Sequence, residues 1–376
     1  MRIGIDTHPL LSTVTGIGRY TQQLIKDLKN IKKASDELIY FWGAEYGITE
    51  YMIDNIDENI HKKRFSITKQ SFWEQFILPY KIYDNDIDVF HSPRNYNIPY
   101  LNLNSCPLIV TMHDIIPLLF PKHFNISIRA RFYLTAKNAD HIITISENSK
   151  KDIIEYFGLN EDKVTVIPNV VNEKFYLKNI DQSLLNEVKD KYNIKRKYLL
   201  TTGGMEQVKN IKLLFEVMKR GKNKDPEIFK NLELVITSPK WLEKEIPKNI
   251  SDDINFTGYI PEQDFPVLMS GAELFLFPSL YEGFGLPPLE AMAAETMVIS
   301  SNTSSLPEVV DKAGIMLDPH SSEPWVDTIS SVLKDQNYKN KYISKGKENV
   351  EKISRAKTAE EIYRTYEEEI WKTNNT

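Results

Sequence analysis

The sequence predicts an α/β protein made of two doubly wound domains. Its 376 residues exceed the roughly 250 to 300 at which a single hydrophobic core stops growing. Short runs of β-branched and apolar residues alternate with helical patterns in each half of the chain, which is typical of parallel sheets covered by helices. A polar stretch without a strand-like run separates the halves. We therefore expect two Rossmann-like domains that face each other across a cleft.

The first half contains a series of strand-like runs separated by helical patterns. After the first run, Ile17, Tyr20 and Leu24 fall on one helical stripe that can pack against the sheet. Ser146 is expected to cap a later helix and Gly158 to end it, because serine favours the N-cap and glycine the left-handed terminus. The expected strands are Arg2–Asp6, Leu38–Trp42, Asp88–Ser92, Leu108–Asp114, His141–Ser146 and Val164–Pro168.

The same alternation restarts in the second half of the chain. We expect a first domain at residues 1–175, a linker at 176–197 and a second domain at 198–355. A last helix at 356–376 either packs back on the first domain or covers the second. The expected strands of the second half are Tyr198–Thr202, Leu232–Ser238, Ile254–Tyr259, Glu273–Pro278, Met297–Ser301 and Gly314–Asp318.

Composition excludes several classes of protein. A hydrophobic fraction of 41% and a charged fraction of 26% are globular values. The net charge of −5 disfavours a dedicated nucleic-acid binder, which needs a basic surface. With Cys106 as the single cysteine, no intrachain disulfide forms, which suits a reducing compartment. Neither an export signal nor a membrane-spanning run is visible, so we expect a cytoplasmic protein.

Two loops of the first half carry candidate site residues. Gly16 and Gly18 follow the first strand, where glycines let the backbone approach a ligand closely, although a simple tight turn has the same pattern. His113 and Asp114 follow the fourth strand-like run, so a titratable imidazole emerges at the carboxyl end of a strand. The alternatives are a histidine bonded to a backbone carbonyl and an aspartate that caps a helix.

The first loop of the second half suits a diphosphate. It contains Gly203 and Gly204, followed by Lys209 and Asn210. Lys209 would bring a positive charge to phosphate oxygens, and Asn210 would cap a helix whose N-terminus faces the same anion. Alternatively, Lys209 is a solvated surface lysine.

The most informative loop runs from Phe277 to Ala293. Gly283 and Gly285 free backbone amides for close contact, and Pro287 and Pro288 fit the first turn of a helix whose N–H groups can bind phosphate. Two carboxylates, Glu282 and Glu290, flank this anion site. A pair of carboxylates also occurs in glycosidases, but glycine amides at a helix start are better suited to binding a diphosphate. We therefore assign both to sugar and ribose hydroxyls.

With these loops, the chain resembles glycosyltransferase family 4, retaining enzymes of the GT-B fold, over nearly its whole length. The E-x7-E motif of that family is present as Glu282 and Glu290. Together the motifs are far more specific than any one of them. Further matching segments are Gly16–Gly18, His91–Pro93, Thr111–Asp114, Thr144–Glu147, Val166–Asn169, Lys209–Asn210, Phe256–Ile260 and Leu306–Glu308.

The resemblance implies a role for each site residue. Glu290 binds the ribose, Lys209 neutralises the diphosphate, and His113 lies beside the transferred sugar as a catalytic residue together with Glu282. The chain departs from many relatives in lacking an arginine near Gly204. Unless another arginine, for example Arg19, supplies that charge, binding of the diphosphate rests mainly on Lys209 and the helix dipole, and activity is still expected. The implied donor-binding set is Gly16, Gly18, Gly204, Lys209, Ile260, Glu282, Gly283, Phe284, Gly285, Leu286 and Glu290.

The resemblance also implies the chemistry. A nucleotide-sugar donor, GDP- or UDP-linked, would be the substrate, with no cofactor and no metal, because amides, a lysine and a helix dipole stabilise the leaving diphosphate. An alternative is the D-x-D pattern of Asp84, Asp86 and Asp88, which resembles the metal motif of the other glycosyltransferase fold, GT-A.

Two further segments bear on the sugar and the acceptor. Segments 15–20 and 91–93 resemble mannosyltransferases of polysaccharide and lipopolysaccharide assembly, so GDP-mannose is the first expectation and a glycan or lipid-linked oligosaccharide the expected acceptor. The alternatives are a UDP-sugar-dependent transferase, a nucleotide-sugar epimerase and a noncatalytic nucleotide-binding partner. The basic and aromatic residues of 61–80 suggest peripheral contact with the inner face of the plasma membrane; alternatively, Trp73 and Phe76 pack into the core.

Overall fold

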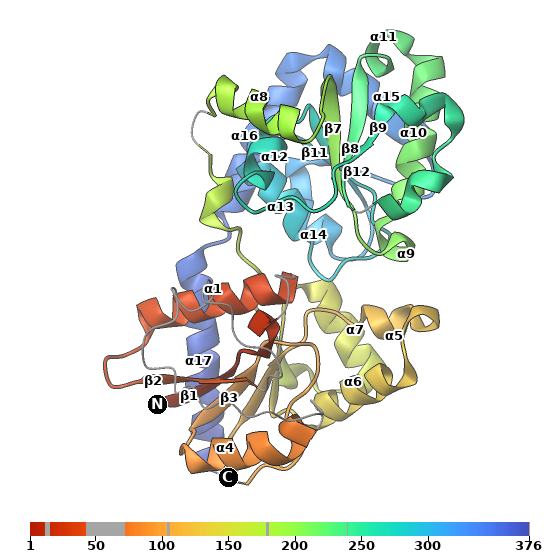
Figure 1. Cartoon of the computed structure of the whole chain (residues 1–376). Helices are drawn as coiled ribbons and strands as arrows, with labels where there is room; N and C mark the ends of the chain where they lie inside the picture. The colour runs from red at the N-terminus through yellow and green to blue at the C-terminus, as the bar shows by residue number, and fades with distance from the viewer. Residues whose placement is uncertain (12–15, 43–71, 104–105, 178–179, 239, 376) are drawn as a thin grey trace. The chain divides into compact units, whose positions relative to one another are not determined.

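The computed structural model describes residues 1–11, 16–42, 72–103, 106–177, 180–238 and 240–375. The chain divides into two compact units (Figure 1). The first unit comprises Met1–Asn169 and Ser354–Thr376, and the second comprises Val170–Ile353.

A parallel sheet with strand order β2-β1-β3-β4-β5-β6 forms the centre of the first unit. β3, β4 and β5 are buried along their whole length, as expected for strands covered on both faces. The six strands expected here are confirmed, although the fourth ends at Thr111 and not at Asp114. The strands are β1 (Arg2–Asp6), β2 (Glu37–Phe41), β3 (Val89–Ser92), β4 (Leu108–Thr111), β5 (His141–Thr144) and β6 (Val164–Val166).

Helices cover both faces of this sheet (Figure 1). α7 shows the caps that its sequence predicts: the Ser146 side chain accepts a hydrogen bond from the Ser149 N–H, and Gly158 ends the helix at φ +64°. The helical elements are η1 (His8–Leu11), α1 (Gly16–Ile31), η2 (Trp73–Ile77), α4 (Leu78–Asp84), α5 (Ile116–Leu119), η3 (Pro121–His123), α6 (Ile126–Asn138), α7 (Glu147–Phe157), η4 (Glu161–Lys163) and α17 (Arg355–Asn374).

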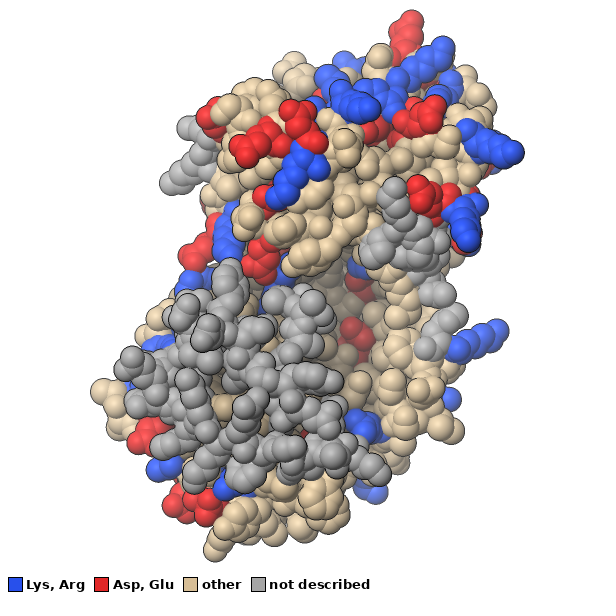
Figure 2. Space-filling model, viewed as in Figure 1, with Lys and Arg blue, Asp and Glu red and all other residues tan. Residues whose placement is uncertain are grey.

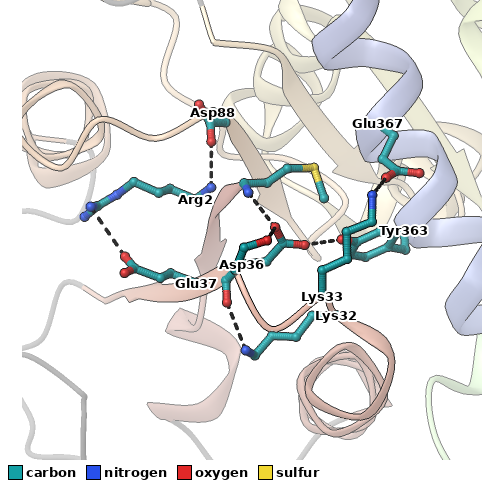
Figure 3. A network of polar contacts seen from close by, with 10 residues as sticks. Arg2, Lys32, Lys33, Asp36, Glu37, Asp88, Tyr363 and Glu367 are labelled. Carbon is teal, nitrogen blue, oxygen red and sulfur yellow. Dashed lines mark hydrogen bonds and ion pairs between the residues drawn. The ribbon is translucent and has the colours of Figure 1, made fainter.

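Helix α17 belongs to the first unit although it comes last in the chain. It packs against α1 and β3, and it buries Tyr366 completely among Ile3, Ile5 and Val89. Polar contacts fix its outer side: the Tyr363 hydroxyl donates to Asp36, which also pairs with the N-terminal amine at 2.6 Å (Figure 3). The last helix therefore packs back on the first domain and does not cover the second, which were the two positions considered for it.

The second unit is built around another parallel sheet, with strand order β12-β11-β10-β7-β8-β9. Its six expected strands are also confirmed. They are β7 (Lys197–Thr202), β8 (Leu232–Thr237), β9 (Ile254–Phe256), β10 (Leu274–Phe277), β11 (Val298–Ser301) and β12 (Ile315–Leu317).

The core of the second unit lies between this sheet and its helices. Trp325 on α15 and Phe229 on α11 are completely buried with Met218 of α10. The helical elements are η5 (Glu173–Phe175), α8 (Gln182–Lys191), α9 (Glu206–Lys209), α10 (Ile211–Lys224), α11 (Pro226–Phe229), η6 (Lys240–Glu245), η7 (Lys248–Asp253), α12 (Phe265–Ser270), α13 (Leu286–Ala293), α14 (Leu306–Val310), η8 (Asp311–Ala313), α15 (Glu323–Lys334) and α16 (Gln336–Glu351).

The boundary between the units differs from the predicted one. The second unit begins at Val170, so the predicted end of the first domain at residue 175 is too late. Residues 176–197 are not a linker, because Gln182–Lys191 form α8, which packs on α12 within the second unit. The polar composition of this stretch reflects a largely exposed surface helix, which resembles a linker in sequence.

The surface of the described residues carries both signs of charge. In the face shown in Figure 2, lysine and arginine side chains alternate with aspartate and glutamate, which agrees with a net charge of only −5. Within the described part of the chain, no helix has the length and apolar character needed to cross a bilayer.

Candidate active site

The strand order of the second unit identifies where a ligand would bind. The chain winds outward in both directions from β7 and β10, which are neighbours in the sheet. In open parallel sheets, ligands bind beyond the carboxyl ends of the strands at such a switch point. The loops after these two strands are those that carry Gly203, Gly204 and Lys209, and Glu282 to Gly285.

Two residues from these loops contact each other directly. Lys209 Nζ lies 2.8 Å from Glu282 Oε1, and the side chains are only 18% and 13% exposed. The same Nζ lies 4.6 Å from the centre of the Phe277 ring, a favourable cation–π position. The two charged groups that sequence reasoning assigned to the diphosphate and the sugar are thus placed together at the switch point.

Serines from the loop after β11 hold the backbone around Glu282. The Glu282 N–H donates to Ser304 Oγ at 2.9 Å, and Ser305 Oγ donates to the carbonyls of Glu282 and Phe284. Sequence reasoning did not select either serine. The available signal was the polar run Asn302–Ser305 directly after a buried strand, because strand-end loops of neighbouring strands meet at one sheet edge.

The start of α13 has the form expected from the sequence. The helix begins at Leu286 with prolines in its first turn, so the expectation for Pro287 and Pro288 is confirmed. Its first N–H groups lack acceptors within the helix and are suited to an anion. Glu290 lies one turn further along and is 4% exposed, and Phe284 and Ile260 are also buried. Gly283 and Gly285 are buried as well.

Gly285 is required by the backbone itself. Its φ is +115°, and a Cβ there would lie 2.7 Å from Leu306 Cδ2. We therefore expect Gly285→Ala to lower the free energy of unfolding by about 1–3 kcal/mol, measured by thermal and urea unfolding. Gly16→Ala is the matched control, because a Cβ at Gly16 meets nothing within 4 Å. Equal stability of the two variants would contradict this account.

The glycines after β7 make room for neighbouring side chains. A Cβ at Gly203 would lie 2.0 Å from Ser238 Cβ, and one at Gly204 would lie 3.1 Å from Lys209 Cγ. Gly204 therefore lets the stem of Lys209 pass close to the backbone. Asn210 takes the N-cap position of α10, but its side chain makes no cap hydrogen bond. Instead its amide donates to the carbonyls of Pro278 and Pro319, so the predicted cap is wrong.

In the first unit, His113 follows β4 and is buried at 7% exposure. Its Nε2 lies 3.1 Å from the Pro93 carbonyl, and its ring packs edge-on against Tyr20 at 4.7 Å. Burial lowers its pKa to about 4, so the imidazole is neutral at neutral pH. A neutral ring that donates from Nε2 leaves Nδ1 as an acceptor. Asp114 accepts from the Ile116 N–H at the start of α5, although the N-cap position of that helix is Ile115 and not Asp114.

A second buried histidine connects this region to α17. His91 is fully buried, with Nδ1 at 2.6 Å from the Tyr366 hydroxyl and Nε2 at 2.7 Å from Thr111 Oγ1. Thr111 Oγ1 also lies 3.0 Å from the Tyr20 hydroxyl, and Tyr20 contacts His113. The chain of contacts runs from the last helix to the candidate catalytic histidine. In the sequence its members other than Tyr366 appear only as parts of separate motifs, at 15–20, His91–Pro93 and Thr111–Asp114.

These histidines make stability depend on pH. Burial lowers the pKa of His91 to about 3 from 6.5, and His113 behaves similarly. The native state stays neutral while the unfolded chain takes up protons, so the free energy of unfolding falls as the pH drops below about 6.5. At pH 5 each histidine lowers the free energy of unfolding by about 2 kcal/mol relative to neutral pH.

Between pH 7 and pH 5, the free energy of unfolding should fall less for His91→Gln than for the unaltered protein. Urea unfolding at each pH measures the change. His320→Gln, at an exposed position, is the control and should follow the unaltered protein. An equal loss in all three proteins would contradict the prediction.

Gly16 and Gly18 lie in the first turn of α1 and not in the loop before it. Gly16 is exposed, whereas Gly18 is buried. The preceding Thr13–Thr15 lie outside the described residues. Arg19, considered as a substitute for the missing arginine, is half-buried in α1.

The D-x-D pattern lies at the amino end of β3, at the opposite edge of the first unit's sheet from the loop that carries His113. Asp84 pairs with Lys81 at 3.4 Å, and Asp88 accepts from the Arg2 N–H at 2.7 Å. Among the residues that the structure describes, no group of three or more His, Cys, Asp or Glu side chains is arranged to hold a metal ion.

Family profiles match both units of the chain. The profile described as Glycosyltransferase Family 4 matches residues 14–175, and the one described as Glycosyl transferases group 1 matches residues 186–349. The chain belongs to glycosyltransferase family 4. The resemblance inferred from the motifs is thereby confirmed.

Relatives of this family 4 glycosyltransferase include bacterial mannosyltransferases. It is 27% identical to the O-antigen chain mannosyltransferase B of Escherichia coli over 368 residues, 90% of this chain and 92% of the relative. It is 30% identical to the serotype-specific mannosyltransferase WbdA of Escherichia coli over 250 residues, 64% of this chain but only 30% of the relative.

Solved structures of similar shape cover nearly the whole family 4 chain. A glycosyltransferase from Rickettsia africae ESF-5 matches with a TM-score of 0.74 at 19% identity, over 98% of each chain. Anabaena Alr3699/HepE in complex with UDP and glucose matches with a TM-score of 0.74 at 16% identity, over 98% of this chain and 100% of that one. Together with the two parallel sheets, this likeness shows the GT-B fold.

Proposed function

We propose that this glycosyltransferase moves mannose from GDP-mannose onto a glycan or lipid-linked oligosaccharide in cell-surface polysaccharide synthesis. The observation that carries the proposal is the Lys209–Glu282 pair at the β7–β10 switch point, beside the start of α13. The mannosyl donor is supported by the relatives whose names specify mannosyltransferases of O-antigen chains. Neither a cofactor nor a metal is part of the proposed reaction.

Each part of the donor has a proposed partner. Glu290 takes the ribose, Lys209 the diphosphate, and Glu282 with the backbone of residues 283–286 the sugar. Lys209 provides the cation and α13 the free N–H groups that stabilise the leaving diphosphate. His113 offers Nδ1 to a hydroxyl of the transferred sugar.

The proposed transfer retains the anomeric configuration. The bond between the anomeric carbon and the diphosphate oxygen breaks, and the acceptor oxygen bonds to that carbon on the same face. The departing diphosphate takes the proton of the acceptor hydroxyl, so no protein nucleophile is needed. The chain's own residues hold the donor and stabilise the charge that develops on the diphosphate.

A UDP-sugar donor is the second candidate. It is favoured by the likeness to Anabaena Alr3699/HepE, whose solved structures contain UDP with glucose and UDP-glucose. Thermal shift with GDP-mannose, UDP-glucose and other nucleotide sugars distinguishes the two, because the preferred donor raises the melting temperature most. The epimerase alternative changes the sugar without an acceptor, and the noncatalytic alternative binds without turnover.

The deciding experiment combines that binding screen with a transfer assay in the presence of EDTA. Transfer of labelled mannose to a polysaccharide or lipid-linked acceptor, with retained configuration by NMR, is the expected result. Loss of activity in EDTA with recovery in Mn²⁺ would contradict metal independence. Conversion of the donor sugar without an acceptor would favour the epimerase.

We also propose peripheral contact with the inner face of the plasma membrane. Phe72 just before η2, Phe76 on η2 and Tyr80 on α4 are 50%, 64% and 52% exposed, while Trp73 is buried. The core-packing alternative therefore holds for Trp73 but not for Phe76. Aromatic side chains are favourable at a membrane interface. The basic part of the predicted stretch, residues 61–69, lies outside the described residues.

The double variant Phe72→Ser/Phe76→Ser should reduce flotation of the protein with anionic liposomes at least about 5-fold. Insertion of two aromatic side chains into a membrane interface contributes a few kcal/mol of binding free energy. Ile126→Ser is the control, because Ile126 is also exposed but lies on α6. Recovery of the unaltered protein only in the soluble fraction would rule out the contact.

A further inference from the structure

The lysine and the glutamate assigned to different parts of the donor are bonded to each other in the second unit. Lys209 Nζ and Glu282 Oε1 are 2.8 Å apart and both side chains are largely buried, at 18% and 13% exposure. Within the same unit, Lys224 and Glu323 form a comparable pair at 3.1 Å with 47% and 62% exposure. The Lys209–Glu282 pair is therefore much better shielded from water and from salt.

The surroundings hold both partners in this position. Ser304 and Ser305 fix the backbone of Glu282, and the absence of a side chain at Gly204 leaves space for the Lys209 stem. The ring of Phe277 supports the ammonium group from another side. An exchange of partners can therefore take place by rotation of the Lys209 and Glu282 side chains, while the backbone of Glu282 stays in place.

A phosphate that approaches Lys209 meets a lysine whose charge is already neutralised. It also meets a carboxylate of the same sign as itself, at a position where shielding by water is weak. Binding of an anion at this point requires Glu282 to give up its cation. A carboxylate left without a partner in a largely buried position costs free energy unless other donors replace the lysine.

We infer that Glu282 makes this site select a nucleoside diphosphate that carries a sugar over the free nucleoside diphosphate. The inference rests on the proposed function. Sugar hydroxyls donate hydrogen bonds to Glu282 and replace Lys209 as its partner, which frees Lys209 for the diphosphate. A free nucleoside diphosphate brings no such hydroxyls to Glu282, so it competes with the carboxylate for the lysine. The site thus favours the donor and disfavours the nucleotide product.

The test compares binding of free and sugar-linked nucleotides by isothermal titration calorimetry. The ligands are GDP, UDP, GDP-mannose and UDP-glucose, measured with the unaltered protein, Glu282→Gln, Lys209→Met and the double variant. Glu282→Gln should bind the free diphosphate about 10-fold more tightly, since it releases Lys209 and removes a like charge. Its preference for the nucleotide sugar over the free diphosphate should fall at least about 10-fold.

Glu323→Gln is the matched control, because it removes a carboxylate from an exposed lysine pair in the same unit; it should change no affinity more than about 2-fold. In the Lys209→Met background only the like-charge repulsion is left to remove, so Glu282→Gln should increase affinity for the free diphosphate clearly less than it does when Lys209 is present. An unchanged or weaker affinity in Glu282→Gln would overturn the inference, as would a full gain in the Lys209→Met background. If the unaltered protein binds none of the four ligands, the proposed function itself fails.

Discussion

Replacing His113 with alanine is expected to lower kcat about 100-fold at saturating donor, while nucleotide binding stays within about 2-fold. The neutral imidazole is held between the Pro93 carbonyl and the Tyr20 ring, and in the proposed function its Nδ1 accepts from a sugar hydroxyl. Loss of a hydrogen bond that strengthens in the transition state costs about 2–3 kcal/mol. In the proposed function the nucleotide is held by residues of the second unit. Its affinity should therefore not fall when kcat falls. Initial rates of labelled sugar transfer and calorimetry with the nucleotide measure the two quantities.

His113→Asn and His320→Ala are the matched variants. Asparagine keeps an acceptor and a donor at a shorter reach and should recover part of the activity, whereas His320 is exposed and its loss should leave the rate unchanged. Unaltered turnover in His113→Ala would show that His113 has only a structural bond to Pro93. Melting temperatures of all variants show whether a lost rate reflects lost folding.

Arg94→Met is expected to destabilise the first unit by about 3–5 kcal/mol, because it removes the cation from two buried carboxylates. Arg94 Nη2 lies 2.7 Å from Asp6 Oδ2 and 3.1 Å from Glu74 Oε1. The two acids are 0% and 2% exposed, so water cannot replace the guanidinium. Urea unfolding monitored by far-UV circular dichroism measures the change.

Arg220→Met provides the control for loss of an arginine. Its partner Glu216 is one turn away on α10, and both side chains are exposed, so the change should stay within about 0.5 kcal/mol. Adding Glu74→Gln to Arg94→Met should recover part of the lost stability, because it removes one of the two buried negative charges. Equal stability of Arg94→Met and the unaltered protein would disprove the role given to this cluster.

The sequence predicted the strands well because each is a short apolar run flanked by turn residues. Parallel strands buried on both faces leave little room for polar residues, so runs such as Leu108–Thr111 and Leu274–Phe277 are distinct from their surroundings. The helix caps were also predictable from local sequence, as Ser146 and Gly158 show. Helix α8 was missed because most of its surface is exposed, so its composition matches that of a linker.

The site was predictable as a set of loops but not as a set of contacts. Glycines, prolines and charges identify the segments around Lys209 and Glu282 from local chemistry alone. The ion pair between these two residues depends on β7 and β10 being neighbours, which is a property of the fold. Asn210 shows the same limit: its sequence position suits a cap, but the nearby carbonyls of Pro278 and Pro319 take its amide.

The position of α17 has a consequence for how the protein is made. Residues 170–353 form the second unit, and only afterwards does the chain return to the first. During synthesis the entire second unit leaves the ribosome before Tyr366 can fill its place among Ile3, Ile5 and Val89. Until α17 is made, the first 169 residues leave part of their apolar core exposed to solvent. This exposed surface can bind chaperones or aggregate. The unit that starts first is the one that can finish folding last.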